Sequence, residues 1–230
     1  MISDLGVIIA AGGSSQRYGE KDKLLENLGG MPVFCCSIRN FLPLISPGNM
    51  VVAVRRDALD SYRKLADEFL PGNRIKWVEG GKNRVESVTN ALAKLPLQEG
   101  LVAIHDAARP LATAELLLKV AQRARICGGA IAASKVADSL KRVGENSMLI
   151  SCPVDRELIY CAETPQIFDL KNYRSACAAL NGEVPTDDAE IMRLAGFPVE
   201  LVISGIWNIK LTSPEDLAKL RYCNPGYSNE

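Results

Sequence analysis

The chain has 230 residues, of which 47% are hydrophobic and 23% charged, so it can form a sizeable core and its composition argues against disorder. Its 27 Lys and Arg residues balance its 27 Asp and Glu residues, which gives no indication of a nucleic-acid or anionic-membrane surface. No apolar stretch reaches the length of a membrane span and the first residues do not resemble a signal peptide, so we expect a cytoplasmic location. The seven cysteines form no CxxC pair and there is one histidine, so we expect reduced thiols rather than a zinc site.

The first strong pattern is an apolar run over residues 5–11 that ends in Gly12 and Gly13. An uninterrupted apolar run predicts a strand that is buried on both faces of a parallel sheet. The glycines allow a ligand to approach the backbone closely, and Ser14 and Ser15 add hydroxyl donors. Three cations follow this loop, namely Arg17, Lys21 and Lys23. Backbone amides beside cations predict a polyphosphate site.

This loop matches neither of the common nucleotide-binding loops. It lacks the Gly-Lys-Ser/Thr of a P-loop and the GxGxxG of a dinucleotide fingerprint. An ordinary strand-to-turn connection followed by a solvated basic surface therefore remains an alternative.

The rest of the chain alternates predicted helices and strands. The helical spacing of apolar residues, or the presence of helix-capping residues, predicts several helices. They are expected over residues 31–42, 57–70, 82–95 and 113–127, from 169, up to 196 and from 213. Apolar runs predict strands at 50–54, 74–78, 101–105, 128–134 and 199–203. This order predicts an α/β protein with a mostly parallel central sheet flanked by helices.

A second glycine pair, Gly80 and Gly81, follows the strand predicted at 74–78, and Arg84 and Ser87 come shortly after it. Ligands of open α/β sheets bind at the carboxyl ends of the strands. Two glycine-bearing strand ends in one sheet therefore predict one shared crevice, although an ordinary loop remains an alternative.

The sequence HDAARP follows the strand at 101–105 and supplies charged side chains to the same edge. One carboxylate plus substrate phosphates is a common way to hold Mg²⁺, so Asp106 is the predicted metal ligand. Arg109 is a cation suited to forked binding of a phosphate. His105 ends an apolar strand, which favours a hydrogen-bonded core residue over a catalytic base.

Residues 135–164 break the alternation and contain few large apolar residues at regular spacing. Either a hairpin arm that leans on a second subunit or a solvated excursion fits this stretch. Farther along the chain, Lys210 is an isolated cation in a short segment that we expect to be extended and to reach the crevice.

Seven motifs occur in order along nearly the whole chain: AAGGSSQR, GGKNRVESV, HDAARP, VADSLKR, ETPQIF, TDDAEI and NIKLTSPEDL. Together they resemble the 2-C-methyl-D-erythritol 4-phosphate cytidylyltransferases of non-mevalonate isoprenoid biosynthesis. The resemblance implies a Rossmann-like, glycosyltransferase-A-like nucleotidyltransferase fold in a single domain of residues 1–230, with 135–164 as the arm of a homodimer. It also implies a reaction of CTP with a sugar-alcohol phosphate that releases pyrophosphate, with Mg²⁺ as cofactor.

The resemblance also implies a role for each matching residue. Arg17, Lys23 and Lys210 correspond to the catalytic cations, and Asp106 corresponds to the metal ligand. The nucleotide-binding positions are Ala10, Ala11, Gly12, Gly13, Ser14, Gly81, Lys82 and Ser87. The acceptor-binding positions are Arg109, Ser139, Arg156 and Thr164, with Ser139 and Arg156 reaching a neighbouring subunit.

The chain departs from the family pattern at several positions. Asp22 replaces a proline and Leu24 a glutamine beside the catalytic lysine, so Lys21 competes with Lys23 for this role. Ser139 replaces a threonine and keeps its hydroxyl group. Trp207 stands where an acidic residue is common, which leaves Asp106 as the main metal-ligand candidate.

Three other functions remain open on these motifs. Ribitol-5-phosphate cytidylyltransferases resemble the same pattern and differ in the acceptor. Molybdenum-cofactor guanylyltransferases share the glycine loop. A non-catalytic nucleotide-binding module is the alternative that the Trp207 departure favours.

Overall fold

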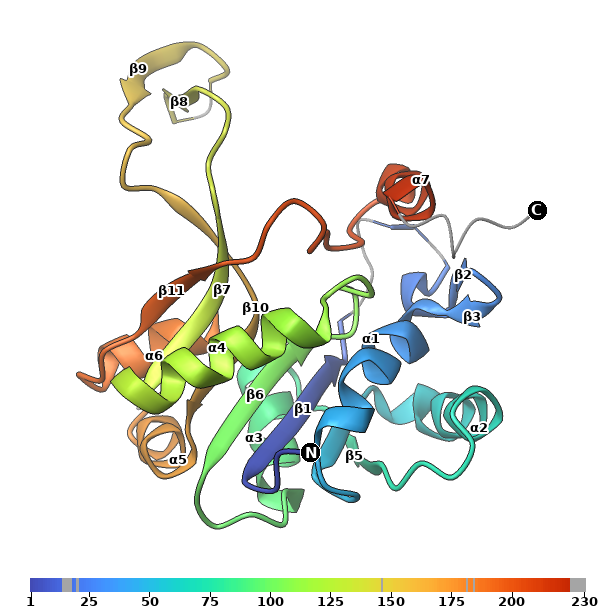
Figure 1. The fold of residues 1–230 in the computed structure, drawn as a ribbon. Coiled ribbons are helices and arrows are strands. Elements are labelled where there is room, and N and C mark those ends of the chain that lie inside the picture. The colour runs from blue at the N-terminus through green and yellow to red at the C-terminus, as the bar shows by residue number, and fades with distance from the viewer. Residues whose placement is uncertain (14–17, 20, 146, 181, 184, 224–230) are drawn as a thin grey trace.

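The structure is a computed structural model that describes residues 1–13, 18–19, 21–145, 147–180, 182–183 and 185–223. Its centre is a seven-stranded sheet in the order β11-β7-β10-β6-β1-β4-β5 (Figure 1). The strands are β1 (Leu5–Ala11), β4 (Met50–Val54), β5 (Lys76–Glu79), β6 (Leu101–Asp106), β7 (Gly129–Lys135), β10 (Tyr160–Asp169) and β11 (Glu200–Ile203). β10 is antiparallel to β6 and β7, and the other pairs are parallel. The predicted mostly parallel sheet is confirmed.

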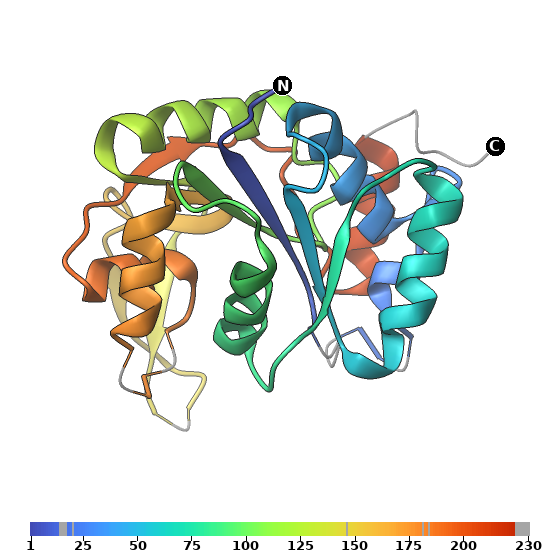
Figure 2. The ribbon, with the colours of Figure 1, turned by 90° about the horizontal axis from the view of Figure 1, so that it is seen from below.

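Helices cover both faces of the sheet (Figure 2). They are α1 (Val33–Phe41), α2 (Leu59–Phe69), α3 (Arg84–Lys94), α4 (Ala114–Cys127), α5 (Leu170–Ala178), α6 (Asp188–Leu194) and α7 (Pro214–Cys223). Successive residues of β1 point to opposite faces of the sheet. Val7 and Ile9 belong to the core formed with α1, α2 and α4, whereas Ile8 belongs to the core formed with α3, α5 and α6 on the other face. Because both faces are buried, the strand needs apolar residues at every position.

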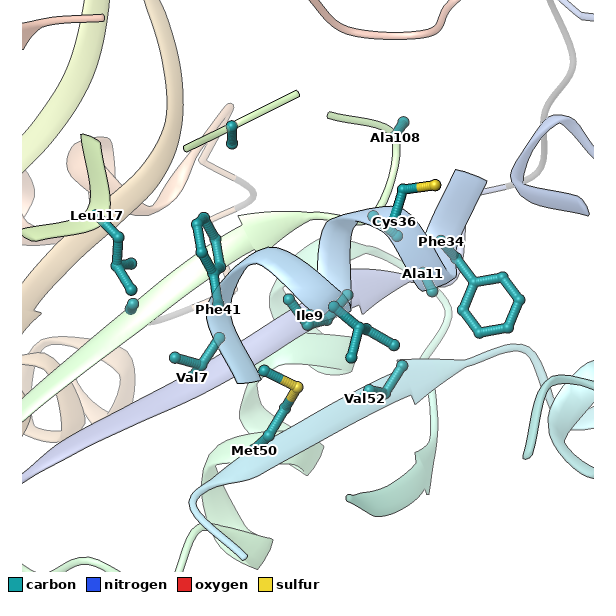
Figure 3. Packing of buried hydrophobic residues seen from close by; sticks show 14 of the residues in the cluster. Val7, Ile9, Ala11, Phe34, Cys36, Phe41, Met50, Val52, Ala108 and Leu117 are labelled. Atoms are coloured by element: carbon teal, nitrogen blue, oxygen red, sulfur yellow. The ribbon is translucent and has the colours of Figure 1, made fainter. Parts of the chain in front are cut away.

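Helix α1 packs closely on β1 and β4 (Figure 3). Phe34 and Phe41 are fully buried in the same cluster as Val7 and Met50. The helix also holds the loop after β6, because the Ser37 hydroxyl donates a hydrogen bond to the Ala107 carbonyl oxygen at 2.8 Å. The core therefore fixes the strand end that carries Asp106.

Two predicted elements differ in detail from the structure. Helix α1 begins at Val33 because Pro32 is its N-cap, and Met31–Pro32 (β3) pairs with Asn27–Leu28 (β2) in a separate two-stranded sheet. The segment 208–211 is not a strand. It is held instead by the Leu211 amide, which donates to the Ala108 carbonyl oxygen at 2.8 Å.

A second two-stranded sheet projects from the ends of β7 and β10 (Figure 1). It consists of β8 (Leu140–Val143) and β9 (Ile150–Val154), which run antiparallel. Because β10 already begins at Tyr160, residues 160–164 lie in the central sheet, whereas the sequence had placed them in the arm. None of the helices in the described residues has the length and apolar character needed to cross a membrane.

Candidate active site

A cavity of about 320 Å³ lies at the carboxyl ends of β1, β5 and β6. The three strand ends contribute to it, as does Lys210 in the loop between β11 and α7. The lining residues are Ala10, Gly12, Gly13, Lys23, Leu24, Gly81, Lys82, Asn83, Arg84, Ser87, Asp106, Ala108 and Lys210. The prediction that the two glycine-bearing strand ends share one crevice is confirmed.

The loop that follows β5 is ordered by hydrogen bonds to the first turn of α3. Asn83 caps the helix by accepting from the Glu86 amide at 2.8 Å, and Glu86 accepts from the Lys82 amide at 2.8 Å. The Ser87 hydroxyl accepts from the Gly81 amide at 3.0 Å and donates to the Asn83 carbonyl oxygen at 2.8 Å. A Cβ atom at position 81 would lie 2.1 Å from Glu86 Cβ, so only glycine fits this loop.

The charges that line this cavity suit an anion. Among the described lining residues, the four cations Lys23, Lys82, Arg84 and Lys210 face a single carboxylate, Asp106. The N-terminus of α3 lies at the same cavity, and its helix dipole also favours negative charge. A polyphosphate would be attracted by both features.

Asp106 lies at the centre of these cations. Its carboxylate oxygens lie 2.7 Å from Lys210 Nζ, 3.5 Å from Arg84 Nη1 and 3.8 Å from Arg109 Nε. Burial acts to raise the pKa of Asp106, but Arg84, Lys210 and Arg109 outweigh it and hold that pKa well below its ordinary range. Asp106 is therefore ionised at neutral pH.

Arg84 forms an ion pair with Asp188 of α6, which does not line the cavity. Asp188 Oδ2 accepts from Arg84 Nη2 at 2.5 Å, and its Oδ1 accepts from the Tyr173 hydroxyl at 2.6 Å. The cap of α6 is not Asp188 but its neighbour Asp187, which accepts from the Glu190 amide at 2.9 Å. Two consecutive carboxylates at a helix start, of which one suffices for capping, were the signal that Asp188 has another partner.

His105 is a core residue, as predicted. Its Nε2 lies 3.3 Å from the Arg109 carbonyl oxygen, which can only accept, so Nε2 carries the hydrogen and Nδ1 accepts from the Thr164 hydroxyl at 3.0 Å. Burial lowers the pKa of His105 to about 4. Thr164 Oγ1 also accepts from the Asp106 amide at 3.0 Å. The hydroxyl of Thr164 thus fixes the backbone of Asp106.

A second cavity, of about 440 Å³, adjoins the first and contains Arg109, Ser134, Glu163 and Asn208 in its lining. Glu163 accepts from the Ser134 hydroxyl at 2.7 Å and from Asn208 Nδ2 at 2.8 Å, and Arg109 Nη1 donates to the Asn208 carbonyl oxygen at 2.6 Å. Lys210 lines both cavities. No role was predicted for Glu163 or Asn208, although each is the first residue of a motif that carries the family resemblance, ETPQIF and NIKLTSPEDL.

The structure distributes the predicted site residues over several locations. One group lines the first cavity: Ala10, Gly12, Gly13, Lys23, Gly81, Lys82, Ser87, Asp106 and Lys210. Arg109 lines the second cavity, Ala11 is buried in the core and Thr164 lies beneath Asp106. Ser139 and Arg156 are exposed at the base of the projecting sheet, outside both linings.

Two predicted residues, Ser14 and Arg17, lie outside the described residues. Of the two competing lysines, Lys23 lines the first cavity, whereas Lys21 is exposed and does not belong to its lining. The structure therefore favours Lys23.

Asp106 is the one carboxylate among the described lining residues of the first cavity, so a divalent cation held there would take its other ligands mainly from a substrate. In the described part of the chain, no group of three or more His, Cys, Asp or Glu side chains is placed to bind a metal. Trp207 is half-exposed and belongs to neither cavity lining. A single permanently ionised carboxylate suits Mg²⁺, which keeps several waters and takes its remaining ligands from phosphates.

Comparisons with known proteins agree with this arrangement. The sequence profile of the 2-C-methyl-D-erythritol 4-phosphate cytidylyltransferase family matches residues 5–222. Relatives of that name from Dictyoglomus thermophilum and Halalkalibacterium halodurans are 33% and 35% identical, covering 93% and 92% of this chain and the same shares of their own.

Solved structures show the same likeness. The crystal structure of 4-diphosphocytidyl-2C-methyl-D-erythritol synthase from Anaerococcus prevotii is 26% identical, with a TM-score of 0.80. That of 2-C-methyl-D-erythritol 4-phosphate cytidylyltransferase from Thermus thermophilus is 27% identical, with a TM-score of 0.79. Each match covers 96% of this chain and 98% of the other. The chain belongs to the 2-C-methyl-D-erythritol 4-phosphate cytidylyltransferase family.

Proposed function

We propose that this enzyme transfers the cytidylyl group of CTP to 2-C-methyl-D-erythritol 4-phosphate and releases pyrophosphate. Family membership supports this reaction. One structural observation supports the placement of the two substrates: Lys210 lines both cavities. If CTP occupies the first cavity and the acceptor the second, their phosphates meet at this ammonium group.

The first cavity suits the nucleotide. The backbone of the two glycine loops, at Ala10, Ala11, Gly12, Gly13, Ser14, Gly81 and Lys82, and the Ser87 hydroxyl would bind CTP. Backbone groups can distinguish the hydrogen-bonding edge of a pyrimidine only if they are held rigidly. The bonds of Gly81 and Lys82 to the start of α3 supply that rigidity.

The acceptor phosphate needs little activation, because its second pKa of about 6 leaves it largely dianionic at neutral pH. It attacks the α-phosphorus in line with the departing pyrophosphate, so catalysis consists mainly of positioning and charge stabilisation. Lys23, Lys210 and Arg17 would stabilise the charge that develops on the α-phosphate and the leaving group. Bound Mg²⁺, held by Asp106 and phosphate oxygens, would supply further charge neutralisation.

Arg109 and Thr164 would form the acceptor side of the site. Arg109 contributes its guanidinium to the second cavity, and Thr164 contributes through its hold on the Asp106 amide. Ser139 and Arg156 would reach the acceptor of a neighbouring subunit in a homodimer. Their exposure at the base of the arm, outside both cavities of their own chain, supports this assignment.

The dimer is further supported by the apolar tip of the arm. Met148, Leu149 and Ile150 are 88%, 80% and 65% exposed, and a lone two-stranded sheet cannot bury them. Analytical ultracentrifugation should find a dimer that the double variant Met148→Ser and Leu149→Ser converts to monomer. A wild-type monomer at micromolar concentration would contradict the assignment.

The function is tested by pyrophosphate release from purified protein with Mg²⁺. Each nucleoside triphosphate is combined with methylerythritol phosphate, with ribitol 5-phosphate or with no acceptor. We expect pyrophosphate release only when CTP is combined with methylerythritol phosphate. We also expect the enzyme to be located in the cytoplasm. Release only with ribitol 5-phosphate would assign another acceptor, and CTP binding without any release would indicate a non-catalytic module.

A further inference from the structure

The carboxylate of Asp22 joins the turn that carries Lys23 to two distant elements. Its Oδ1 accepts from the Leu24 amide at 3.1 Å, within the turn. Its Oδ2 accepts from the Tyr62 hydroxyl at 2.9 Å and lies 3.4 Å from Arg55 Nη2. Tyr62 belongs to α2 and Arg55 follows β4, so one side chain connects three parts of the chain.

The turn itself is short, and its buried residue packs into the core. It is a 3₁₀ helix of three residues, η1 (Lys23–Leu25), in which only Leu24 is buried. So short a helix is closed by very few backbone bonds, here chiefly from the Leu25 amide to the Asp22 carbonyl oxygen at 3.0 Å. The N-cap carboxylate of Asp22 therefore contributes substantially to the stability of this turn.

The anchor on the other side is rigid. The Tyr62 side chain is 1% exposed, and its ring centroid lies 4.5 Å from that of Phe34 in the core. Burial, followed by the charge of Asp22, raises the pKa of Tyr62 far above its ordinary range, so the hydroxyl keeps its proton and donates it. Because the Asp22 side chain is itself only 19% exposed, water competes weakly for this bond.

We propose that Asp22 is a positioning residue for Lys23: its carboxylate fixes the η1 turn against Tyr62 and Arg55 and so aims the Lys23 ammonium into the first cavity. The proposal rests on the proposed function in taking Lys23 as a group that stabilises the transition state. Small displacements of such a group, on the order of 1 Å, cost up to about 100-fold in rate. The loss should appear in kcat, because the other cations of the cavity still bind the nucleotide.

Three variants separate positioning from a direct role of the carboxylate. Asp22→Ala should lower kcat about tenfold or more and change KM for CTP less than about threefold. Asp22→Pro should recover most of that loss, because the φ of Asp22 is −76° and proline imposes about −65° without a carboxylate. Asp57→Ala is the matched control, since Asp57 pairs with the same Arg55 at 3.6 Å but is 77% exposed and away from the turn.

A second readout does not depend on activity. Cleavage by the lysine-specific protease Lys-C after Lys23, mapped by mass spectrometry, reports local opening of the turn. We expect cleavage about tenfold faster in Asp22→Ala than in the wild type, with Asp22→Pro and Asp57→Ala close to the wild type at unchanged Tm. If Asp22→Ala were cleaved at the same rate as the wild type, the proposal would be overturned. This holds even if neither the wild type nor any variant released pyrophosphate. Equal loss of kcat in Asp22→Ala and Asp22→Pro would overturn it in favour of a direct role for the carboxylate.

Discussion

Lys210 Nζ lies 2.7 Å from Asp106 Oδ2, and Lys210 belongs to the linings of both cavities. The pair thus connects the proposed nucleotide and acceptor sites. Without substrate, the ammonium is neutralised by Asp106. In the proposed complex, phosphate oxygens would share this ammonium group with Asp106, so binding would redistribute an existing contact.

Replacing Lys210 should affect turnover more than nucleotide binding. We expect Lys210→Ala to lower kcat about 10²–10³-fold, because it removes charge stabilisation that is strongest in the transition state. KM for CTP should change much less, since Lys23, Lys82 and Arg84 remain. Steady-state pyrophosphate release measures both values. Lys219→Ala, which removes an exposed lysine paired with Asp216, is the control and should behave as wild type.

Asp106 should determine how much Mg²⁺ the reaction needs. Asp106→Asn keeps the shape of the side chain but removes the charge that three cations surround. We expect the Mg²⁺ concentration for half-maximal rate to rise about tenfold or more, with a lower maximal rate. Titration of the rate with Mg²⁺ tests this. An unchanged Mg²⁺ requirement would assign the metal to the phosphates alone, and Glu99→Gln serves as an exposed control.

Asp188 should be needed for stability as well as for the position of Arg84. Asp188→Ala leaves the partly buried Arg84 guanidinium and the buried Tyr173 hydroxyl without their shared acceptor, which should lower the free energy of unfolding by about 3 kcal/mol. Tyr173→Phe removes one hydrogen bond and should cost about 1 kcal/mol. Urea unfolding measures both. Similar costs for the two variants would show that Arg84 does not depend on Asp188.

The sequence predicted those parts of the site that follow from strand direction. Residues that directly follow parallel strands, such as Gly12, Gly81 and Asp106, must meet at one edge of the sheet, and the cavity confirms that they do. Lys210 was predicted only as an isolated cation expected to reach the crevice. Its place there depends on the Leu211 amide bonding to the loop after β6, which no local pattern encodes.

The support behind the site could not be predicted in the same way. Asp188 and Arg84 are 104 residues apart, and Thr164 reaches His105 across 59 residues. Hydrophobic periodicity reports which face of an element is buried, but not which buried polar groups meet. The antiparallel direction of β10 brings Thr164 beside the Asp106 amide, and no strand was predicted at 160–169, because polar residues interrupt the apolar pattern of this segment.

His105 links the core to the pH dependence of stability. Its ring is fully buried against Phe41, with ring centroids 4.7 Å apart, and its two nitrogens are occupied by Thr164 and the Arg109 carbonyl oxygen. Protonation would place a hydrogen on Nδ1, which now accepts from the Thr164 hydroxyl. Burial therefore lowers the pKa of His105 to about 4, from an ordinary value of 6.5.

The lowered pKa of His105 predicts the sign of an acid effect. Below pH 6.5 the unfolded chain binds a proton at this position, whereas the native ring does so only near pH 4. The free energy of unfolding should therefore fall by about 3 kcal/mol through His105 as the pH drops from about 6.5 to 4. In His105→Gln this contribution disappears. Urea unfolding at several pH values should therefore show that the free energy of unfolding declines less steeply with falling pH than in the wild type, whatever the stability of the variant at pH 7. Parallel declines for the two proteins would mean that the ring is protonated equally in the native and unfolded states.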